Sequence, residues 1–286
     1  MDEPIRSREA RARAETALVR VLWQLTETTV RPIVLGGLVP DVLVDGVEPA
    51  PPPHLGTTDV DVYIELGVAN DDATLVALEG ALRAASFAPD GRRTGGWRWR
   101  GDIDGTLVKV ELLGERPDAA NESVTTAPSG ALGVLNLRGT GFVARDHEGR
   151  MLRGRLSDGT QVSVEAHFAG LQGFLLAKMF AARARGLDRD FYDLVYVLLH
   201  NRLGGPAEAA RAIRAGTFRN DLPSLLMTLR EIGERFRDGS DAGATGYARE
   251  AAQTAQIDGQ ITAAELRADA IGAITTFLDA LEAKAG

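Results

Sequence analysis

Two aspartates spaced two residues apart, Asp59 and Asp61, are the side chains of this sequence best suited to chemistry. They stand in the run DVDVYIEL, where polar and apolar residues alternate with the period of a β-strand. Both carboxylates therefore leave the same face of that strand, with their Cα atoms roughly 7 Å apart. Carboxylates this close repel each other unless a cation lies between them, and magnesium is the hard cation they suit. The alternative is an ordinary two-faced strand whose aspartates face water.

A third acidic residue lies in a second strand-like run, TLVKVELL, which contains Glu111 between two apolar neighbours. A neighbouring strand that carries one carboxylate beside such a pair completes a metal-binding triad. Asp102 and Asp104 compete with Glu111 for the third position, but their surroundings are typical of a turn.

A glycine turn precedes the aspartates. The short apolar run 33–35 predicts a buried strand that ends in Gly36 and Gly37, and Thr57 stands two residues before the first aspartate. Between them, Pro49 to His54 contains four prolines and predicts an irregular loop. A Gly-Gly turn alone is weak evidence of function, because many turns contain one, but a Gly-Gly turn followed by Asp-x-Asp is more specific.

Farther along the chain, a lysine is predicted to face the protein interior. Lys178 falls on the apolar stripe of a helix that begins near residue 171, and burying an unpaired ammonium group is costly. Either its stem lies along the core and its charge reaches water, or it is a cation directed at a bound phosphate. Asp190 and Asp193 follow on one face of the next helix. Arg185 is either a phosphate contact or a surface charge.

These elements predict an α+β fold with two domains. Strands and helices mix up to about residue 167, and from 168 to 286 the pattern is almost wholly helical, with breaks at 204–206, 220–223 and 239–243. We therefore expect a mixed-sheet domain over 1–167, followed by a helical domain over 168–286 that completes a cleft.

The composition excludes several classes of protein. The 286 residues include no cysteine, which rules out disulfides, thiolate metal sites and a cysteine nucleophile. No apolar run of the ~18 residues that a membrane helix needs is present, and the N-terminus lacks a signal-peptide pattern, so we expect a cytoplasmic protein. The net charge of −8 argues against a generally basic nucleic-acid-binding surface, although a local basic groove remains compatible with it.

The order of strand, Gly36-Gly37 turn, helix, loop and Asp59-Val-Asp61, with a later strand carboxylate, resembles the nucleotidyltransferase superfamily of DNA polymerase β-like folds. The resemblance implies that backbone amides of Gly36 and Gly37 cradle a nucleoside triphosphate. It also implies that Asp59, Asp61 and Glu111 hold two magnesium ions, one at the attacking oxygen and one at the leaving pyrophosphate. The gap between Gly37 and Asp59 is longer than is usual in the superfamily, and a surface insertion there costs little.

The block AKMFAARARGLDRDFYDLVYVLL resembles the AbiEii branch of this superfamily, the nucleotidyltransferase toxins of abortive-infection and toxin–antitoxin systems. By this resemblance Lys178 contacts the triphosphate, and Asp193, with Asp190 second, belongs to the active-site cleft. Thr57 lies near the phosphates, and Arg185 contacts a phosphate or the acceptor. Some members carry an arginine where this chain has His54 and the following leucine, so that a basic contact is either absent or supplied by the histidine.

The function implied is transfer of a nucleoside monophosphate from an NTP to RNA, especially the 3′ end of tRNA, by a toxin restrained by a cognate antitoxin. Basic side chains with Trp97 and Trp99 would help to hold a strand end, although tryptophans in an alternating run such as WRWR more often belong to the core or cover it. A second interpretation keeps the reaction but makes the acceptor a small molecule or a protein hydroxyl, and a third makes the chain a non-catalytic nucleotide-binding module. The resemblance covers 33–66 and 171–200 and is weak over the last ~80 residues.

Overall fold

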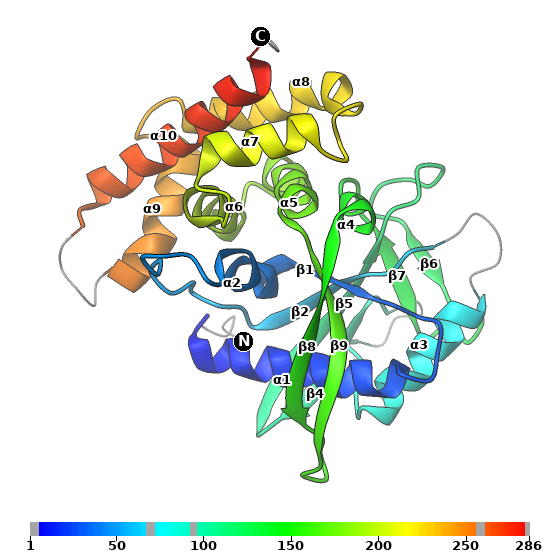
Figure 1. Ribbon diagram of the computed structural model, residues 1–286. Coiled ribbons are helices and arrows are strands. Elements are labelled where there is room, and N and C mark those ends of the chain that lie inside the picture. The colour runs from blue at the N-terminus through cyan, green and yellow to red at the C-terminus, as the bar shows by residue number, and fades with distance from the viewer. Residues whose placement is uncertain (1–5, 67–71, 92–95, 256–260, 284–286) are drawn as a thin grey trace. The chain divides into compact units, whose positions relative to one another are not determined.

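The computed structural model describes residues 6–66, 72–91, 96–255 and 261–283 (Figure 1). The chain divides into two compact units, which we call the sheet unit (Met1–Val39 and Gly56–Ala169) and the helical unit (Pro40–Leu55 and Gly170–Gly286). The break at Ala169 falls close to the predicted end of the first domain. The segment Pro40–Leu55, which we expected within that domain, groups with the helical unit instead.

The sheet unit contains a mixed sheet with helices. Its helices and strands in chain order are α1 (Arg8–Leu25), β1 (Ile33–Leu35), η1 (Gly36–Leu38), β2 (Asp59–Tyr63), α3 (Asp72–Ala84), β3 (Ala88–Pro89), β4 (Arg98–Ile103), β5 (Thr106–Gly114), β6 (Val124–Thr126), β7 (Gly133–Asn136), α4 (Phe142–Arg145), β8 (His147–Arg155) and β9 (Gln161–Ala169). The strand order is β3-β4-β5-β2-β1-β9-β8, and β7 pairs with both β5 and β6. Neighbours β2 and β5 run parallel, as do β1 and β9, whereas β1 and β2 run antiparallel. This sheet, followed by a helical region, confirms the predicted α+β class.

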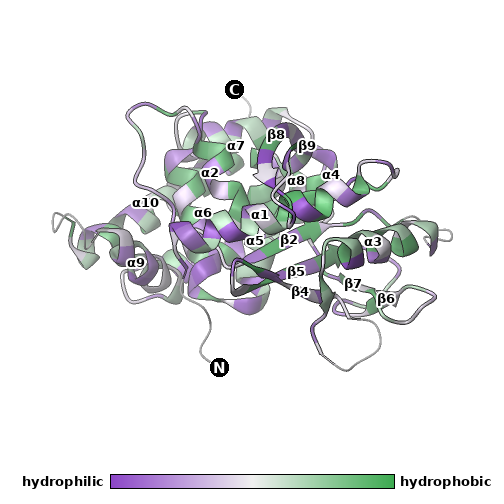
Figure 2. Ribbon diagram, turned by 90° about the horizontal axis from the view of Figure 1, so that it is seen from below, coloured by the Kyte–Doolittle hydropathy of each residue, from purple (hydrophilic) through white to green (hydrophobic). Residues whose placement is uncertain are grey.

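The two faces of β2 and β5 differ in character. One face is apolar and lies against α1, so that side chains of both strands and of the helix line the same small void: Leu18, Val21, Leu22, Val60, Val62, Val110 and Leu112. Burying each such side chain contributes roughly 1.5–3 kcal/mol. Because side chains alternate along a strand, the opposite face carries the residues between them, such as Asp61 and Glu111, which are polar. Figure 2 shows that hydrophilic and hydrophobic residues are mixed along the helices and strands.

A tight hairpin connects β4 and β5. Asp104 (φ 52°) and Gly105 (φ 79°) both have positive φ, as a two-residue type I′ turn requires. The Asp102 carboxylate accepts a hydrogen bond of 2.8 Å from the Gly105 N–H. Both aspartates therefore serve the turn, in agreement with the sequence-based interpretation.

The helical unit contains α2, except for its first residue, and every helix that follows β9 in the described part of the chain. Their bounds are α2 (Val39–Val44), α5 (Leu171–Arg185), α6 (Asp188–His200), α7 (Pro206–Ala215), α8 (Leu222–Gly233), η2 (Glu234–Phe236), α9 (Ala242–Ala255) and α10 (Ala263–Glu282). The predicted breaks before α7, α8 and α9 are confirmed. Helix α5 ends at Gly186, which adopts the left-handed conformation (φ 61°) typical of a helix C-terminus.

The proline-rich segment belongs to the helical unit because α6 holds it. The Tyr196 hydroxyl donates to the carbonyl oxygen of Pro52 at 2.8 Å, and the Leu55 N–H donates to the Tyr192 hydroxyl oxygen at 3.2 Å. These contacts join residues 144 and 137 positions apart, so they could not be predicted from local sequence pattern.

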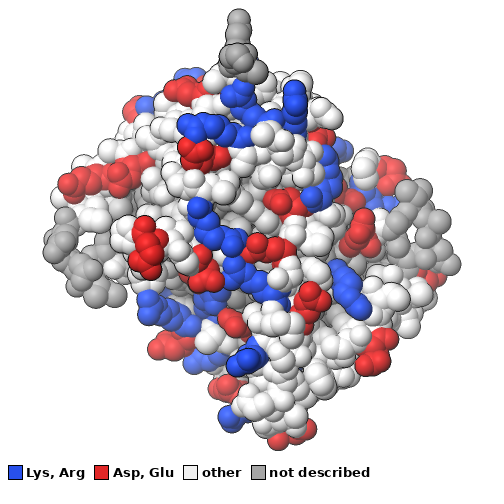
Figure 3. Space-filling view, in the orientation of Figure 1, with Lys and Arg blue, Asp and Glu red and all other residues white. Residues whose placement is uncertain are grey.

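Acidic and basic side chains are interspersed on the face shown in Figure 3. Among the described residues, none of the helices combines the length and the apolar character that crossing a bilayer requires.

Candidate active site

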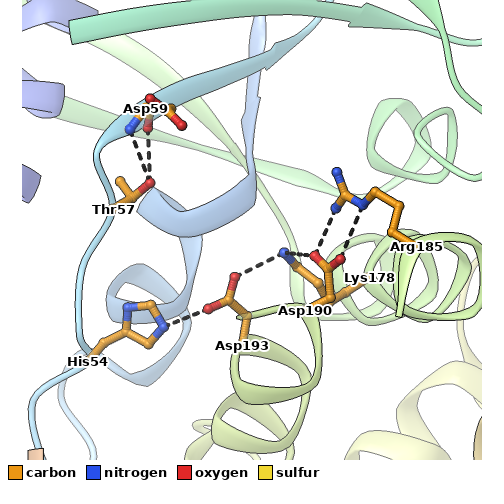
Figure 4. Close-up of polar contacts among 7 residues, drawn as sticks. All are labelled: His54, Thr57, Asp59, Lys178, Arg185, Asp190 and Asp193. Carbon is orange, nitrogen blue, oxygen red and sulfur yellow. Dashed lines mark hydrogen bonds and ion pairs between the residues drawn. The ribbon is translucent and has the colours of Figure 1, made fainter. Parts of the chain in front are cut away.

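The side chains of Asp59 and Asp61 lie on the polar face of β2, as predicted, and both residues are half-buried. The start of this strand is fixed by Thr57. Its hydroxyl oxygen accepts from the Asp59 N–H at 3.3 Å and the hydroxyl donates to the Asp59 carbonyl oxygen at 3.2 Å (Figure 4). Thr57 therefore acts on the backbone that carries the first aspartate.

The glycine turn after β1 packs directly against these residues. Gly36 has a φ of +74°, and a Cβ built there would lie 2.8 Å from Cγ of Asp61 and closer still to its Oδ2 atom. A Cβ on Gly37 would lie 2.6 Å from the Thr57 Cβ. Real Cβ atoms do not approach other atoms this closely, so a side chain at either position would force the Asp61 or Thr57 side chain, or the turn, to move. The structure thus brings together four residues that the sequence predicted for one site.

Glu111 lies beside Asp61. The two residues are register partners on the parallel strands β5 and β2, so their side chains share a face and are direct neighbours. Glu111 also has a partner on its other side: Arg98 of β4 is its register partner, and the Arg98 Nε atom donates to Glu111 Oε1 at 2.7 Å. The guanidinium group stacks over the Trp97 ring, 4.0 Å from the ring centroid.

A second row of charges runs beside the first. Asp59 is the register partner of Lys109 on β5, and Lys109 is the register partner of Arg100 on β4. Arg100 forms an ion pair with Asp90 at 3.4 Å. The sequence-based analysis grouped Arg98 and Arg100 as basic residues around the tryptophans but did not consider Lys109. Its spacing of two from Glu111 along an alternating strand marks Lys109 as a residue of the polar face.

The ligand chemistry of this face suits magnesium. Asp59, Asp61 and Glu111 supply only carboxylate oxygens, which a hard cation prefers, and all three project from one side of two adjacent strands. Among the described residues, no three acidic or histidine side chains are gathered closely enough to hold a metal ion as they stand. The contact with Arg98 engages the third carboxylate of the set.

The helical unit holds the other predicted site residues in a buried cluster. Lys178 of α5, with 8% of its surface exposed, forms ion pairs with Asp193 at 2.9 Å and with Asp190 at 3.4 Å. Arg185 adds two hydrogen bonds to Asp190, from its Nε atom at 3.1 Å and from Nη2 at 2.8 Å (Figure 4). Two cations therefore face two carboxylates, and the burial of Lys178 is explained by ion pairing rather than by a stem reaching out to water.

His54 completes this cluster. Its side chain is fully buried, its Nε2 atom lies 3.0 Å from Asp193 Oδ1, and its ring packs against Tyr192 and Tyr196 at centroid distances of 5.0 and 4.9 Å. Burial raises the pKa of both tyrosine hydroxyls well above the ordinary value, so both stay protonated at neutral pH. The sequence left open whether His54 supplies a basic contact, and the structure shows its partner to be Asp193.

Trp99, which we considered as a stacking platform for RNA, has no exposed surface, and its Nε1–H donates to the Gly96 carbonyl oxygen at 3.0 Å. The stacking role is therefore wrong for Trp99 and the alternative, a core tryptophan, is confirmed, because alternation along β4 turns its side chain into the core. Trp97 is half-buried and stacks with Arg98.

No protein-family model matches the chain, and no curated protein matches it significantly. Among solved structures, it is similar to that of the STING-associated CdnE c-di-GMP synthase from Capnocytophaga granulosa, with 13% sequence identity and a TM-score of 0.30. The match covers 98% of this chain and 84% of that chain.

Proposed function

We propose that this chain is a magnesium-dependent nucleotidyltransferase, which transfers a nucleoside monophosphate from an NTP to an acceptor hydroxyl and releases pyrophosphate. The observation that carries the proposal is the packing of the Gly36-Gly37 turn against Asp61 and Thr57, beside three carboxylates on one face of β2 and β5. A purely structural sheet has no need for acidic neighbours on adjacent strands, because like charges placed there destabilise it.

In this proposal, Asp59, Asp61 and Glu111 hold two magnesium ions. When bound, these ions would neutralise the triphosphate and favour the ionised form of the acceptor hydroxyl. The acceptor oxygen forms a bond to the α-phosphorus while the bond from that phosphorus to the pyrophosphate oxygen breaks, and the hydroxyl proton leaves to a carboxylate or to water. Thr57 holds the backbone at Asp59, and the turn at Gly36 and Gly37 offers its backbone to the phosphates.

Lys178 and Arg185, together with Asp190 and Asp193, are proposed to serve the nucleotide from the helical unit. Support for this comes from the AbiEii resemblance and from the pairing of these four side chains, which orients both cations. The same ion pairs would also stabilise the helical unit. An experiment therefore has to separate the role of these residues in stability from a role in nucleotide binding.

As acceptor we propose RNA, in particular the 3′ end of tRNA, with the chain acting as a toxin that a cognate antitoxin restrains. The AbiEii resemblance supports this choice, and the basic side chains Arg98, Arg100 and Lys109 on the polar face of the sheet are compatible with a phosphate backbone.

The test is to incubate the protein with magnesium and each α-labelled NTP, with and without total tRNA. The Asp59→Asn/Asp61→Asn variant removes the proposed metal ligands, and Asp104→Asn is a matched control because it removes a carboxylate of the same unit at a turn. Label on tRNA that depends on Asp59 and Asp61 supports the proposal. Label on the protein or on a small molecule would keep the reaction and change the acceptor. A protein that neither binds nucleotide nor transfers label would overturn the proposal.

A further inference from the structure

One carboxylate of the polar face, that of Glu111, has two candidate cationic partners, the proposed metal ion and Arg98. Glu111 is the register partner of Asp61 on one side and of Arg98 on the other, and Arg98 contacts it at 2.7 Å. The Glu111 side chain is only 16% exposed, so this contact is partly shielded from water, whereas the Arg98 side chain is 48% exposed.

The guanidinium group of Arg98 is held in place for this contact. It stacks on the Trp97 ring at 4.0 Å, and a planar guanidinium loses little conformational freedom when it is already stacked. Without a metal, Asp61 and Glu111 would place two like charges on adjacent strands, an arrangement that destabilises a sheet. Arg98 supplies a positive charge on the Glu111 side of this pair.

We propose that Arg98 occupies the place of a cation at Glu111, so that a divalent ion binds with its full set of carboxylates only when Arg98 is displaced. This inference rests on the proposed function, since it concerns the same carboxylates. It explains why the described residues hold no ready group of three ligands, although three carboxylates share one face.

The displacement couples metal binding to nucleotide binding. Once released from Glu111, the Arg98 guanidinium needs a new anion, and a triphosphate beside the carboxylates supplies one. The nucleotide therefore removes the competitor of the metal, and metal should bind more tightly when nucleotide is present. In a protein without Arg98, this part of the coupling is lost.

The experiment is a titration with Mn²⁺ alone, in which free Mn²⁺ is measured by electron paramagnetic resonance. The variants are Arg98→Ala, Arg100→Ala, Asp59→Asn, Glu111→Gln and the double variant Arg98→Ala/Glu111→Gln. Arg100 is a matched control because it lies on the same strand and face and is equally exposed, at 50%, but pairs with Asp90 instead. Both arginines are exposed enough to be replaced without loss of the fold, which circular dichroism would check.

We expect Arg98→Ala to bind Mn²⁺ about three- to fivefold more tightly than the wild-type protein, the range expected for loss of one partly exposed ion pair. Arg100→Ala should stay within about twofold of wild type, because its guanidinium group pairs with Asp90 and not with a proposed metal ligand. In the Glu111→Gln background, removal of Arg98 should give no gain.

Equal Mn²⁺ affinity of Arg98→Ala and Arg100→Ala, with binding still dependent on Asp59, would overturn the role of Arg98 and leave the metal site standing. Absence of Mn²⁺ binding from the wild type and from every variant would overturn the proposed magnesium site itself. The two failures are therefore distinguishable without any assay of nucleotide transfer.

Discussion

Replacement of Gly36 by alanine tests whether the glycine turn positions the carboxylates. Two effects are expected. A φ of +74° is unfavourable for alanine by about 1–2 kcal/mol, and the new Cβ would collide with the Asp61 carboxylate, whose Cγ would be 2.8 Å away. The collision is relieved only if the Asp61 side chain or the turn moves, by about an ångström or more.

The matched control is Gly105→Ala. Gly105 has nearly the same φ, +79°, and lies in the same unit, but a Cβ there would meet nothing within 4 Å. It therefore carries the conformational cost alone. A loss of 1 kcal/mol lowers the melting temperature of a unit this size by roughly 2–4 °C, so Gly105→Ala should show a shift of that order and Gly36→Ala a somewhat larger one.

Function should separate the two variants far more clearly than stability does. A displacement of about 1 Å in a catalytic group costs on the order of 100-fold in rate. We therefore expect Gly36→Ala to lose about 100-fold in nucleotide transfer and to bind Mn²⁺ more weakly, while Gly105→Ala keeps both. The measurements are label transfer at saturating NTP and Mn²⁺ titration, with melting curves for each protein. If Gly36→Ala matched Gly105→Ala in rate and Mn²⁺ affinity, the close packing of the turn on Asp61 would have no functional role.

Three further outcomes are expected in the helical unit. Lys178→Met should lower the free energy of unfolding by about 3–5 kcal/mol in urea titrations, because two buried carboxylates lose a partner; a fully stable variant with a raised KM for NTP would instead assign Lys178 to the nucleotide alone. Tyr192→Phe leaves the buried Leu55 N–H without its acceptor and should cost about 1–3 kcal/mol in the same titrations, and an unchanged midpoint would contradict this. Burial lowers the pKa of His200 below 6.5, so the unfolded chain takes up a proton at a higher pH than the folded one. Stability should therefore be complete above about pH 6.5 and fall below it, and His200→Gln should flatten that fall in unfolding curves at pH ~5–8.

The sequence sufficed for the elements that depend on local pattern. Alternation in DVDVYIEL predicted that Asp59 and Asp61 share a face, and both residues lie on the same, less buried face of β2. Helical spacing predicted that Lys178 faces inward, and it is buried. In each case the period of the residues determines which side of an element they occupy, and that period is visible without any knowledge of the rest of the chain.

The partners of these residues could not be predicted, because they are set by pairing over long distances. For Glu111 the order of motifs and the family resemblance suggested a place beside the aspartates, but not that Asp61, fifty positions earlier, would be its register partner, and nothing indicated that Arg98 would engage it from β4. The contact of His54 with Asp193 likewise depends on how Pro40–Leu55 packs on α6. Periodicity indicates a face, whereas register between strands and the docking of a loop are decided by the packing of the entire unit.

The grouping of Pro40–Leu55 with the helical unit has a practical consequence for dividing this protein. The backbone passes from one unit to the other after Val39, returns before Gly56 and leaves again after Ala169, so neither unit is a continuous stretch of chain. A fragment that ends at Ala169 would carry His54 without Asp193, and the complementary fragment would have a buried carboxylate cluster without its histidine. Expression of the halves as separate pieces should therefore give poorly folded products.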